Sequence, residues 1–219
     1  ACYERVLDLR PGHSEAMSYL VAHFTEAEEW DHLVALYEDA LRSRGKLEDE
    51  AGTLLQLGMV HWRFRSSPAD AEPYFARLRK MDPAHPGMLD FYREYLKDAE
   101  DEQRWVTILT DAQRRAETEE QKLQLAIELA RVAQQSAGGT ERAIDAWKAV
   151  LRLDPSHPEA PEALKELYEK SEKWNALVEL LKGEVDRIPD EEPERKVAML
   201  RHLVPIYRDK LGLDVMVIN

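Results

Sequence analysis

A proline followed two residues later by a histidine returns at a fixed interval along this chain. The pair lies in the segments LDLRPGH, RKMDPAHP and LRLDPSHP, with prolines at positions 11, 83 and 155, so both intervals measure 72 residues. A second recurrent segment, rich in apolar residues, is marked by Trp30, Trp105 and Trp174. Repetition at a long fixed period is typical of chains built from stacked copies of one structural unit.

Each period divides into two units of about 36 residues, which is close to the length of a helical hairpin repeat. In residues 48–83, apolar positions follow helical spacing at Leu54 and Leu57 before a Ser66-Ser67-Pro68 break, and again at Phe75 and Leu78 after it. The same rhythm runs through residues 125–153, where Gly138-Gly139 supplies the break. Each unit is therefore predicted to be two helices joined by a turn.

These positions resemble the tetratricopeptide repeat family, whose pattern has Leu-Gly on the first helix and Ala-x3-Phe with a closing proline on the second. Ala71-x3-Phe75 with Pro83, and Ala143-x3-Trp147 with Pro155, match the second half. Leu54-x2-Leu57-Gly58-x2-His61 matches the first half, although the turn that follows is one residue too long. The resemblance covers essentially the whole chain, and it implies a right-handed superhelix of hairpins that engages its ligands on a concave face.

We predict an all-α fold, an α-solenoid of antiparallel helical hairpins, with a single array over residues 1–219. Five complete hairpins are expected at about 14–45, 48–83, 86–117, 119–155 and 159–189, with partial units at 1–10 and 192–219. The expected helices span 2–9, 14–26, 29–43, 48–65, 68–81, 86–99, 102–116, 119–136, 140–153, 159–171, 174–187 and 193–211.

Both ends of the chain fall within a repeat, so we expect it to be a fragment of a longer protein. Further repeats would then cover the apolar residues Val215, Met216, Val217 and Ile218. The alternative is that the terminal residues are frayed, or that they cap the array by a different packing.

Charge narrows the choice of partner. The sequence has 30 Lys and Arg against 43 Asp and Glu, a formal net charge of −13. Nucleic acid and anionic membrane surfaces are held by clustered basic residues, so neither is expected as a partner, whereas a basic polypeptide would be attracted. No apolar run reaches the roughly 18 to 20 residues of a membrane span, and the first residues hold no apolar signal segment.

We therefore expect a soluble protein and favour the cytoplasm. Cys2 is the only cysteine, so no disulfide can form within the chain. The absence of disulfides does not separate cytoplasm from periplasm, and the compartment stays open.

The histidines show no catalytic or metal-binding pattern. His13, His85 and His157 lie four helices apart, and helices pack about 8–10 Å from each other, so these imidazoles cannot share a metal ion. Each is instead expected to help start the helix that follows it. No HExxH spacing, nucleophile elbow or phosphate loop surrounds the other candidates, and AGGTER at 137–142 reads as an interhelical turn. We predict no enzyme activity, no metal and no cofactor.

The remaining candidate is a binding surface on the first helix of a hairpin. In the fifth hairpin, four glutamates recur at helical spacing along one stripe, which we call the acidic stripe: Glu159, Glu162, Glu166 and Glu169. The third hairpin offers Asp90 and Glu94 at corresponding positions, with Lys97 breaking the run. The stripe is either a solvated helix face or a contact for a basic peptide.

The predicted function is a scaffold or adaptor that binds a partner polypeptide on its concave face. Two alternatives stay open: a regulatory or structural repeat segment of a larger enzyme or signalling protein, and a module that associates with itself. Repeat architecture describes how a surface is built and does not identify its ligand.

Overall fold

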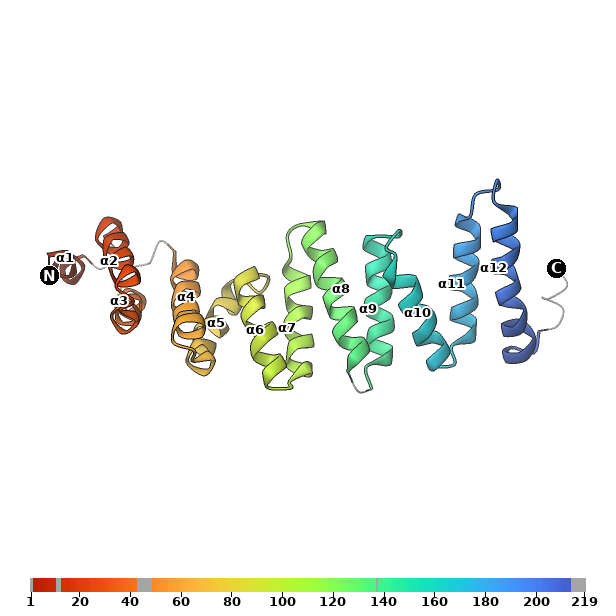
Figure 1. The fold of residues 1–219 in the computed structure, drawn as a ribbon, viewed down its shortest axis with the longest axis horizontal. Helices are drawn as coiled ribbons and strands as arrows, with labels where there is room; N and C mark the ends of the chain where they lie inside the picture. Colours follow the sequence, from red (N-terminus) through yellow and green to blue (C-terminus); the bar gives the residue numbers. More distant parts are fainter. Residues whose placement is uncertain (1, 11–12, 43–48, 137, 214–219) are drawn as a thin grey trace. The chain divides into compact units, whose positions relative to one another are not determined.

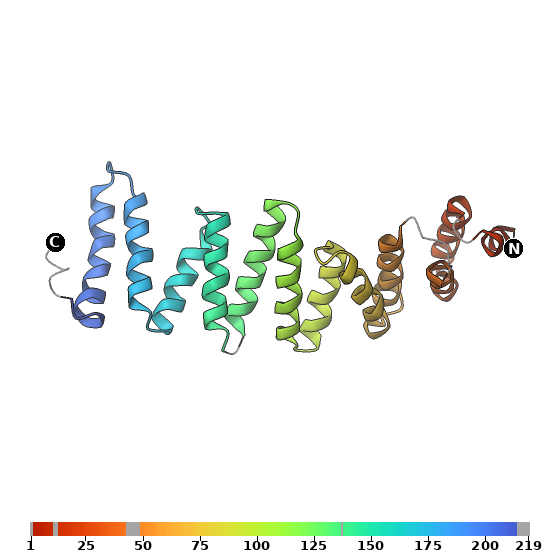
Figure 2. The same ribbon diagram turned by 180° about the vertical axis from the view of Figure 1, so that it is seen from behind.

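The computed structural model describes residues 2–10, 13–42, 49–136 and 138–213, and every regular element in those ranges is a helix (Figures 1 and 2). The predicted all-α fold of helical hairpins is confirmed. The chain divides into two compact units, Ala1–Arg115 and Ala116–Asn219, each of which is described by itself. The prediction of one continuous array over 1–219 stays a prediction, and Pro11 and residues 215–218 lie outside the described residues.

The first unit consists of a lone helix followed by three hairpins, in which α2 packs on α3, α4 on α5 and α6 on α7. Its elements are α1 (Cys2–Leu9), α2 (Ser14–Glu26), α3 (Trp30–Arg42), α4 (Glu50–Met59), η1 (Val60–Phe64), α5 (Pro68–Met81), α6 (Pro86–Asp98) and α7 (Glu102–Arg115). Successive hairpins also touch, through α3 with α4 and α5 with α6.

The second unit contains the hairpins α8–α9 and α10–α11, followed by α12. Its elements are α8 (Glu119–Gln135), α9 (Thr140–Leu153), α10 (Glu159–Lys170), α11 (Trp174–Arg187), α12 (Pro193–Pro205) and η2 (Ile206–Lys210). In both units the helix limits agree with the predicted ones within about two residues, except where α4 and α12 pass into π-helical turns.

The recurrent proline terminates the second helix of a hairpin, as its missing N–H predicts. Helices α5 and α9 end just before Asp82 and Asp154, which have nearly the same extended backbone, with φ −136° and −135°. Each aspartate accepts a hydrogen bond of 3.0 Å from the backbone N–H two residues later. The turn is therefore the same structure in both hairpins.

The recurrent histidine then starts the next helix in two of three cases. His13 Nδ1 accepts a hydrogen bond from the N–H of Ala16 at 3.3 Å, and His157 Nδ1 accepts one from Ala160 at 3.2 Å. These bonds satisfy N–H groups that a helix start leaves without a partner in the helix. His85 occupies the same position before α6, but its Nδ1 accepts no bond from the described residues, so the predicted capping role is wrong there.

The hairpin cores follow the motif that the sequence repeats. Ala71 and Ala143 are completely buried, as are the bulky Phe75 and Trp147 one helical turn later. A Cβ placed on Gly58 of α4 would lie 2.8 Å from Cε2 of Phe75, closer than a real contact allows. Gly58 is therefore small because the Phe75 ring lies directly against its backbone.

Two π-helical turns, which the sequence analysis did not predict, end the first helices α4 and α12. In η1 the N–H of Arg65 donates to the carbonyl of Val60, and in η2 the N–H of Leu211 donates to that of Ile206, both at 3.0 Å. A π-turn adds one residue to a helix without breaking its hydrogen-bonded chain. In α4–α5 it takes up the surplus residue that the motif comparison noted after His61.

Each π-turn also covers a tryptophan at the start of the preceding hairpin's second helix. In the first unit the Phe64 ring stacks on Trp30, with centroids 4.4 Å apart. In the second unit the Lys210 ammonium lies 4.8 Å from the ring centroid of Trp174. An aromatic ring and a cation thus cover the tryptophan at matching places, because both are attracted to the face of an indole.

Ion pairs link successive hairpins on both of their sides. Arg63 of η1 donates two hydrogen bonds, of 2.9 and 3.0 Å, to the Glu94 carboxylate of α6, and Arg131 of α8 pairs in the same way with Glu159 of α10. Between second helices, Arg104 of α7 pairs with Glu72 of α5. The matching pair in the second unit joins Lys173, just before α11, to Glu141 of α9.

Candidate functional site

The acidic stripe lies on α10, where the hydrophobic pattern placed it. The opposite side of the helix is buried through Leu164, Leu167 and Tyr168. Glu162, Glu166 and Glu169 are exposed, whereas Glu159 at the start of the helix is partly covered. The four glutamates are therefore on one surface, and their neighbours decide which of them is available to a ligand.

Glu159 is held by the neighbouring hairpin. Its carboxylate accepts hydrogen bonds from Arg131 of α8, one of them at 3.0 Å from Nε. The hydrogen bond from Arg131 lowers the pKa of Glu159 below its usual value, so the carboxylate is charged at neutral pH. Because this bidentate pair joins α8 to α10, we assign Glu159 a part in stacking the hairpins.

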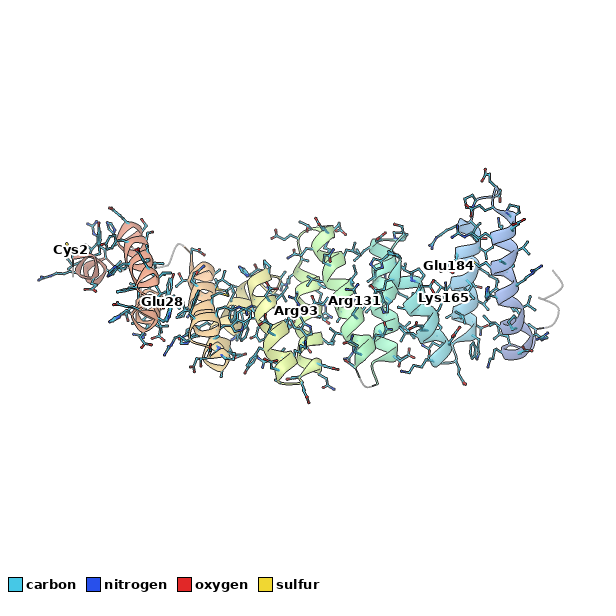
Figure 3. All side chains as sticks on the ribbon, viewed as in Figure 1. Cys2, Glu28, Arg93, Arg131, Lys165 and Glu184 are labelled. Carbon is cyan, nitrogen blue, oxygen red and sulfur yellow. The ribbon has the colours of Figure 1, made fainter. Side chains whose placement is uncertain are left out.

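Glu162 takes part in a three-residue ion-pair cluster. The Lys165 ammonium lies 2.8 Å from the Glu162 carboxylate and 2.9 Å from that of Glu184 on α11. Figure 3 shows Lys165 and Glu184 side by side where α10 faces α11. Burial lowers the pKa of Lys165, but hydrogen bonds to the two glutamates outweigh burial and raise it above its ordinary value.

Glu166 and Glu169 are the two members of the stripe for which the described residues offer no ion-pair partner within 4 Å. Glu169 also lines a groove, whereas Glu166 does not. The predicted stripe thus separates into a half that stabilises the fold and a half that faces solvent.

The corresponding residues of the first unit are both paired. Asp90 lies 2.6 Å from Arg93 on its own helix. Glu94 accepts the two hydrogen bonds of Arg63 described above. Both carboxylates are therefore explained by ion pairs within the fold, whereas Glu166 and Glu169 of α10 are not.

The groove beside Glu169 lies between α10 and α12, with α11 at its floor, and has a volume of about 550 Å³. Such a volume suits a peptide side chain or a small ligand, because binding sites commonly measure about 300–1,000 Å³. Its lining residues come from all three helices and from η2: Lys165, Glu169, Leu177, Leu181, Arg195, Ala198, Met199, His202, Pro205 and Ile206.

Apolar side chains form the base of the groove and charged groups lie along its walls. Leu177 and Leu181 are buried in α11, and Met199 of α12 is half-buried. Glu169 stands on the α10 wall, opposite Arg195 and His202 of α12. The α12 residues of the groove were not predicted from the sequence. The expected helix limits of 193–211 include these residues, but the limits do not show that they face α10.

The arrangement is suited to binding. It offers an apolar base for burial and charges for orientation, the two components that ligand sites combine. In the described ranges, no three His, Cys, Asp or Glu side chains come together as a metal site would require.

Within 2–10, 13–42, 49–136 and 138–213, no helix has both the length and the apolar character needed to span a bilayer.

Comparisons with known proteins give structural neighbours only. No family model matches the sequence, and no curated protein matches it. Among solved structures, MamA is 15% identical, with 90% of this chain and 94% of that chain covered and a TM-score of 0.46. YrrB, described as a TPR protein with an unusual peptide-binding site, is 18% identical over 87% and 94%, with a TM-score of 0.45.

Yeast Tom70 is 15% identical, with 95% of this chain but 42% of that chain covered and a TM-score of 0.42. All three identities are far below those that carry function from one protein to another. The tetratricopeptide-like fold stands on the chain's own hairpins, its 72-residue period and the buried Ala-x3-aromatic pairs of α5 and α9.

Proposed function

We propose that this chain is a protein-interaction module that binds a partner polypeptide in the groove between α10 and α12. The observation that carries the proposal is the groove itself, with its buried leucine base and with Glu169 on its wall. A segment with apolar side chains and a neighbouring lysine or arginine fits both features, because Lys165 and Arg195, which also line the groove, are paired with other glutamates. The high acidic charge of the chain favours encounter with such a segment.

Most of the affinity is expected to come from the apolar base. Burying one leucine-sized side chain contributes about 1.5–3 kcal/mol, whereas an exposed ion pair contributes about 0.2–1 kcal/mol. Glu169 would therefore set the preference for a basic segment and the salt dependence of binding more than its strength.

The test is a panel of synthetic peptides that combine apolar and basic residues, measured by fluorescence anisotropy against the chain and its variants. Ala198→Trp fills the groove from the exposed side of α12, and we expect it to weaken binding at least about tenfold, or 1.4 kcal/mol. Glu169→Lys should weaken binding about two- to fivefold. Unchanged affinity in Ala198→Trp would exclude the groove as the binding site.

The charge control is Glu191→Lys, which changes the net charge equally at an exposed residue outside the groove. We expect this variant to bind like the unchanged chain. Glu162 is unsuitable for a charge reversal, because its loss would also disturb the Lys165 and Glu184 contacts. Equal weakening by Glu191→Lys and Glu169→Lys would mean that net charge, and not the groove wall, selects the ligand.

A further inference from the structure

Two adjoining cavities lie among α1, α2 and α3 of the first unit, far along the sequence from the groove proposed above. They measure about 420 Å³ and 330 Å³, and they share Glu4, Leu20, Phe24 and His32 as lining residues. Continuity of the lining makes them one recessed surface, which we call the N-terminal recess.

Aromatic rings form a ladder along this recess. The rings of Tyr3 and Tyr19 lie 4.4 Å apart, Tyr19 and His23 lie 6.2 Å apart, and Phe24 and His32 lie 5.3 Å apart. Tyr19 is 53% exposed, so a ligand has access to a ring that is already positioned by its neighbours. Aromatic faces carry partial negative charge and attract cations placed over them.

Three carboxylates and two histidines line the recess. Glu4 and Glu29 line the larger cavity, and Glu4 and Asp39 line the smaller one. Among the described residues that line either cavity there is no lysine or arginine. The Glu29 carboxylate lies 3.2 Å from Nδ1 of His32 at the edge of the ladder and is 45% exposed. Rings and carboxylates together favour a cationic ligand.

The same chain shows how a guanidinium occupies such a setting. The Arg63 guanidinium lies 3.4 Å from the centroid of the Trp62 ring, and it donates two hydrogen bonds to Glu94. A flat cation is thus stacked on a ring and fixed at its edge by a carboxylate. Tyr19 and Glu29 both line the larger cavity of the recess, so they offer these two elements to a ligand that enters it.

We propose that the N-terminal recess binds an arginine side chain of a partner polypeptide. The guanidinium stacks on the Tyr19 end of the ring ladder and donates to Glu29, while the alkyl stem lies against Leu20 and Phe24. Arginine is preferred to lysine because its planar group stacks and donates in pairs, whereas an ammonium is a compact, strongly hydrated point charge.

The test uses the whole chain and three short peptides that are identical except for one central residue: arginine, lysine or citrulline, the neutral analogue of arginine. Binding is followed at pH 7.5 by NMR shifts of the Tyr19, His23 and His32 rings. We expect the arginine peptide to bind at least about fivefold more tightly than the citrulline peptide, with lysine between them. Equal binding of arginine and citrulline would overturn the proposal.

Two variants locate the contact. Tyr19→Leu and Glu29→Gln should each weaken arginine binding at least about threefold, and circular dichroism should show unchanged helicity because both side chains are exposed. Met81→Leu is the control, since Met81 is 49% exposed on α5 and should not affect binding. Ala198→Trp should also leave the arginine peptide unaffected, which keeps this site distinct from the α10–α12 groove. Full binding by both Tyr19→Leu and Glu29→Gln would contradict the assignment.

Discussion

The hairpins α4–α5 and α8–α9 connect matching positions of their two helices over the same number of residues, but with different turns. Thirteen positions separate Gly58 from Ala71 in the first and Ala130 from Ala143 in the second, and all four residues are buried small residues. In α4–α5 the chain takes up this length in the π-turn η1 and then in Ser66, at φ 51°. In α8–α9 the first helix stays α-helical to Gln135, and Gly138 turns the chain at φ 75°.

The contact between the two helices differs correspondingly. In α4–α5 the Trp62 ring meets the Phe75 ring edge-on, with centroids 6.1 Å apart. In α8–α9, 72 positions later, Trp147 donates a hydrogen bond of 2.8 Å from Nε1 to the Gln134 side chain. The repeat therefore preserves which positions touch, whereas the turn and the chemistry of the contact differ between the two hairpins.

The largest expected effect comes from removing an anchor of either hairpin. Phe75→Ala should lower the free energy of unfolding by about 3–5 kcal/mol, because a completely buried aromatic side chain is replaced by a cavity. Trp147→Ala should lower it by a similar amount. Urea unfolding followed by circular dichroism measures both. A loss below about 1 kcal/mol in one of them would show that the two hairpins do not share this anchor.

Glycine in the α8–α9 turn is the next test. A Cβ on Gly139 would lie 2.2 Å from the backbone carbonyl oxygen of Ala133, so Gly139→Ala should cost about 1–3 kcal/mol through backbone displacement. Gly183→Ala in α11 is the control. No heavy atom lies within 4 Å of its Cβ, and the change should stabilise the helix by about 1 kcal/mol. Thermal unfolding distinguishes the two, and equal stability of both variants would exclude the backbone clash.

Acidification should destabilise α4–α5 more than α8–α9, because the two hairpins differ at one buried position. His61 is 6% exposed and both of its ring nitrogens lack a partner among the described residues, whereas the equivalent position in α8 is Ala133. Burial lowers the pKa of His61, as does Arg65, against the opposing carboxylates Asp70 and Glu38.

The unfolded chain therefore takes up this proton first as the pH falls through about 6.5. The free energy of unfolding should decrease from that pH downward and level off below the lowered pKa of folded His61. Hydrogen exchange at pH 7.5 and 5.5 should show loss of protection in α4–α5, and His61→Phe should remove that loss. A loss of equal size in the His61→Phe variant would assign it to other groups.

The smallest expected effect concerns Ser66. A residue other than glycine in the left-handed region costs about 1–2 kcal/mol, and glycine avoids this cost. The greater entropy of glycine in the unfolded chain offsets about 0.5–1 kcal/mol of that gain. Ser66→Gly should therefore stabilise the chain by about 0.5 kcal/mol. Differential scanning calorimetry should show a rise of about 1–2 °C. A fall in melting temperature would mean that losing the serine side chain costs more than relief of its backbone strain gains.

Much of the fold follows from the sequence because burial imposes a period. The spacing of Ala71 with Phe75 and of Ala143 with Trp147 predicted the second helices and their limits. The π-turns were not predicted, since the segment after Gly58 contains no proline or glycine before Pro68 to distinguish a π-turn from a longer loop.

The candidate site was predictable only in part. Helical spacing placed Glu159 and Glu169 on one face, but it carried no information about Arg131, which lies 28 positions before Glu159 in the sequence and beside it in the structure. The groove depends on which side of α12 faces α10, and a single helix pattern does not specify its neighbour. The sequence pattern predicted the hairpins better than it predicted the contacts between them.

The ion pairs between hairpins have a direction that bears on assembly. On the first-helix side the base precedes the acid, as in Arg63 with Glu94 and Arg131 with Glu159. On the second-helix side the acid precedes the base, as in Glu72 with Arg104 and Glu141 with Lys173. Hairpins α4–α5 and α8–α9 therefore present the same pair of charges to whatever follows them. They should be interchangeable modules in a recombined chain, because each places a base on its first-helix side and an acid on its second-helix side.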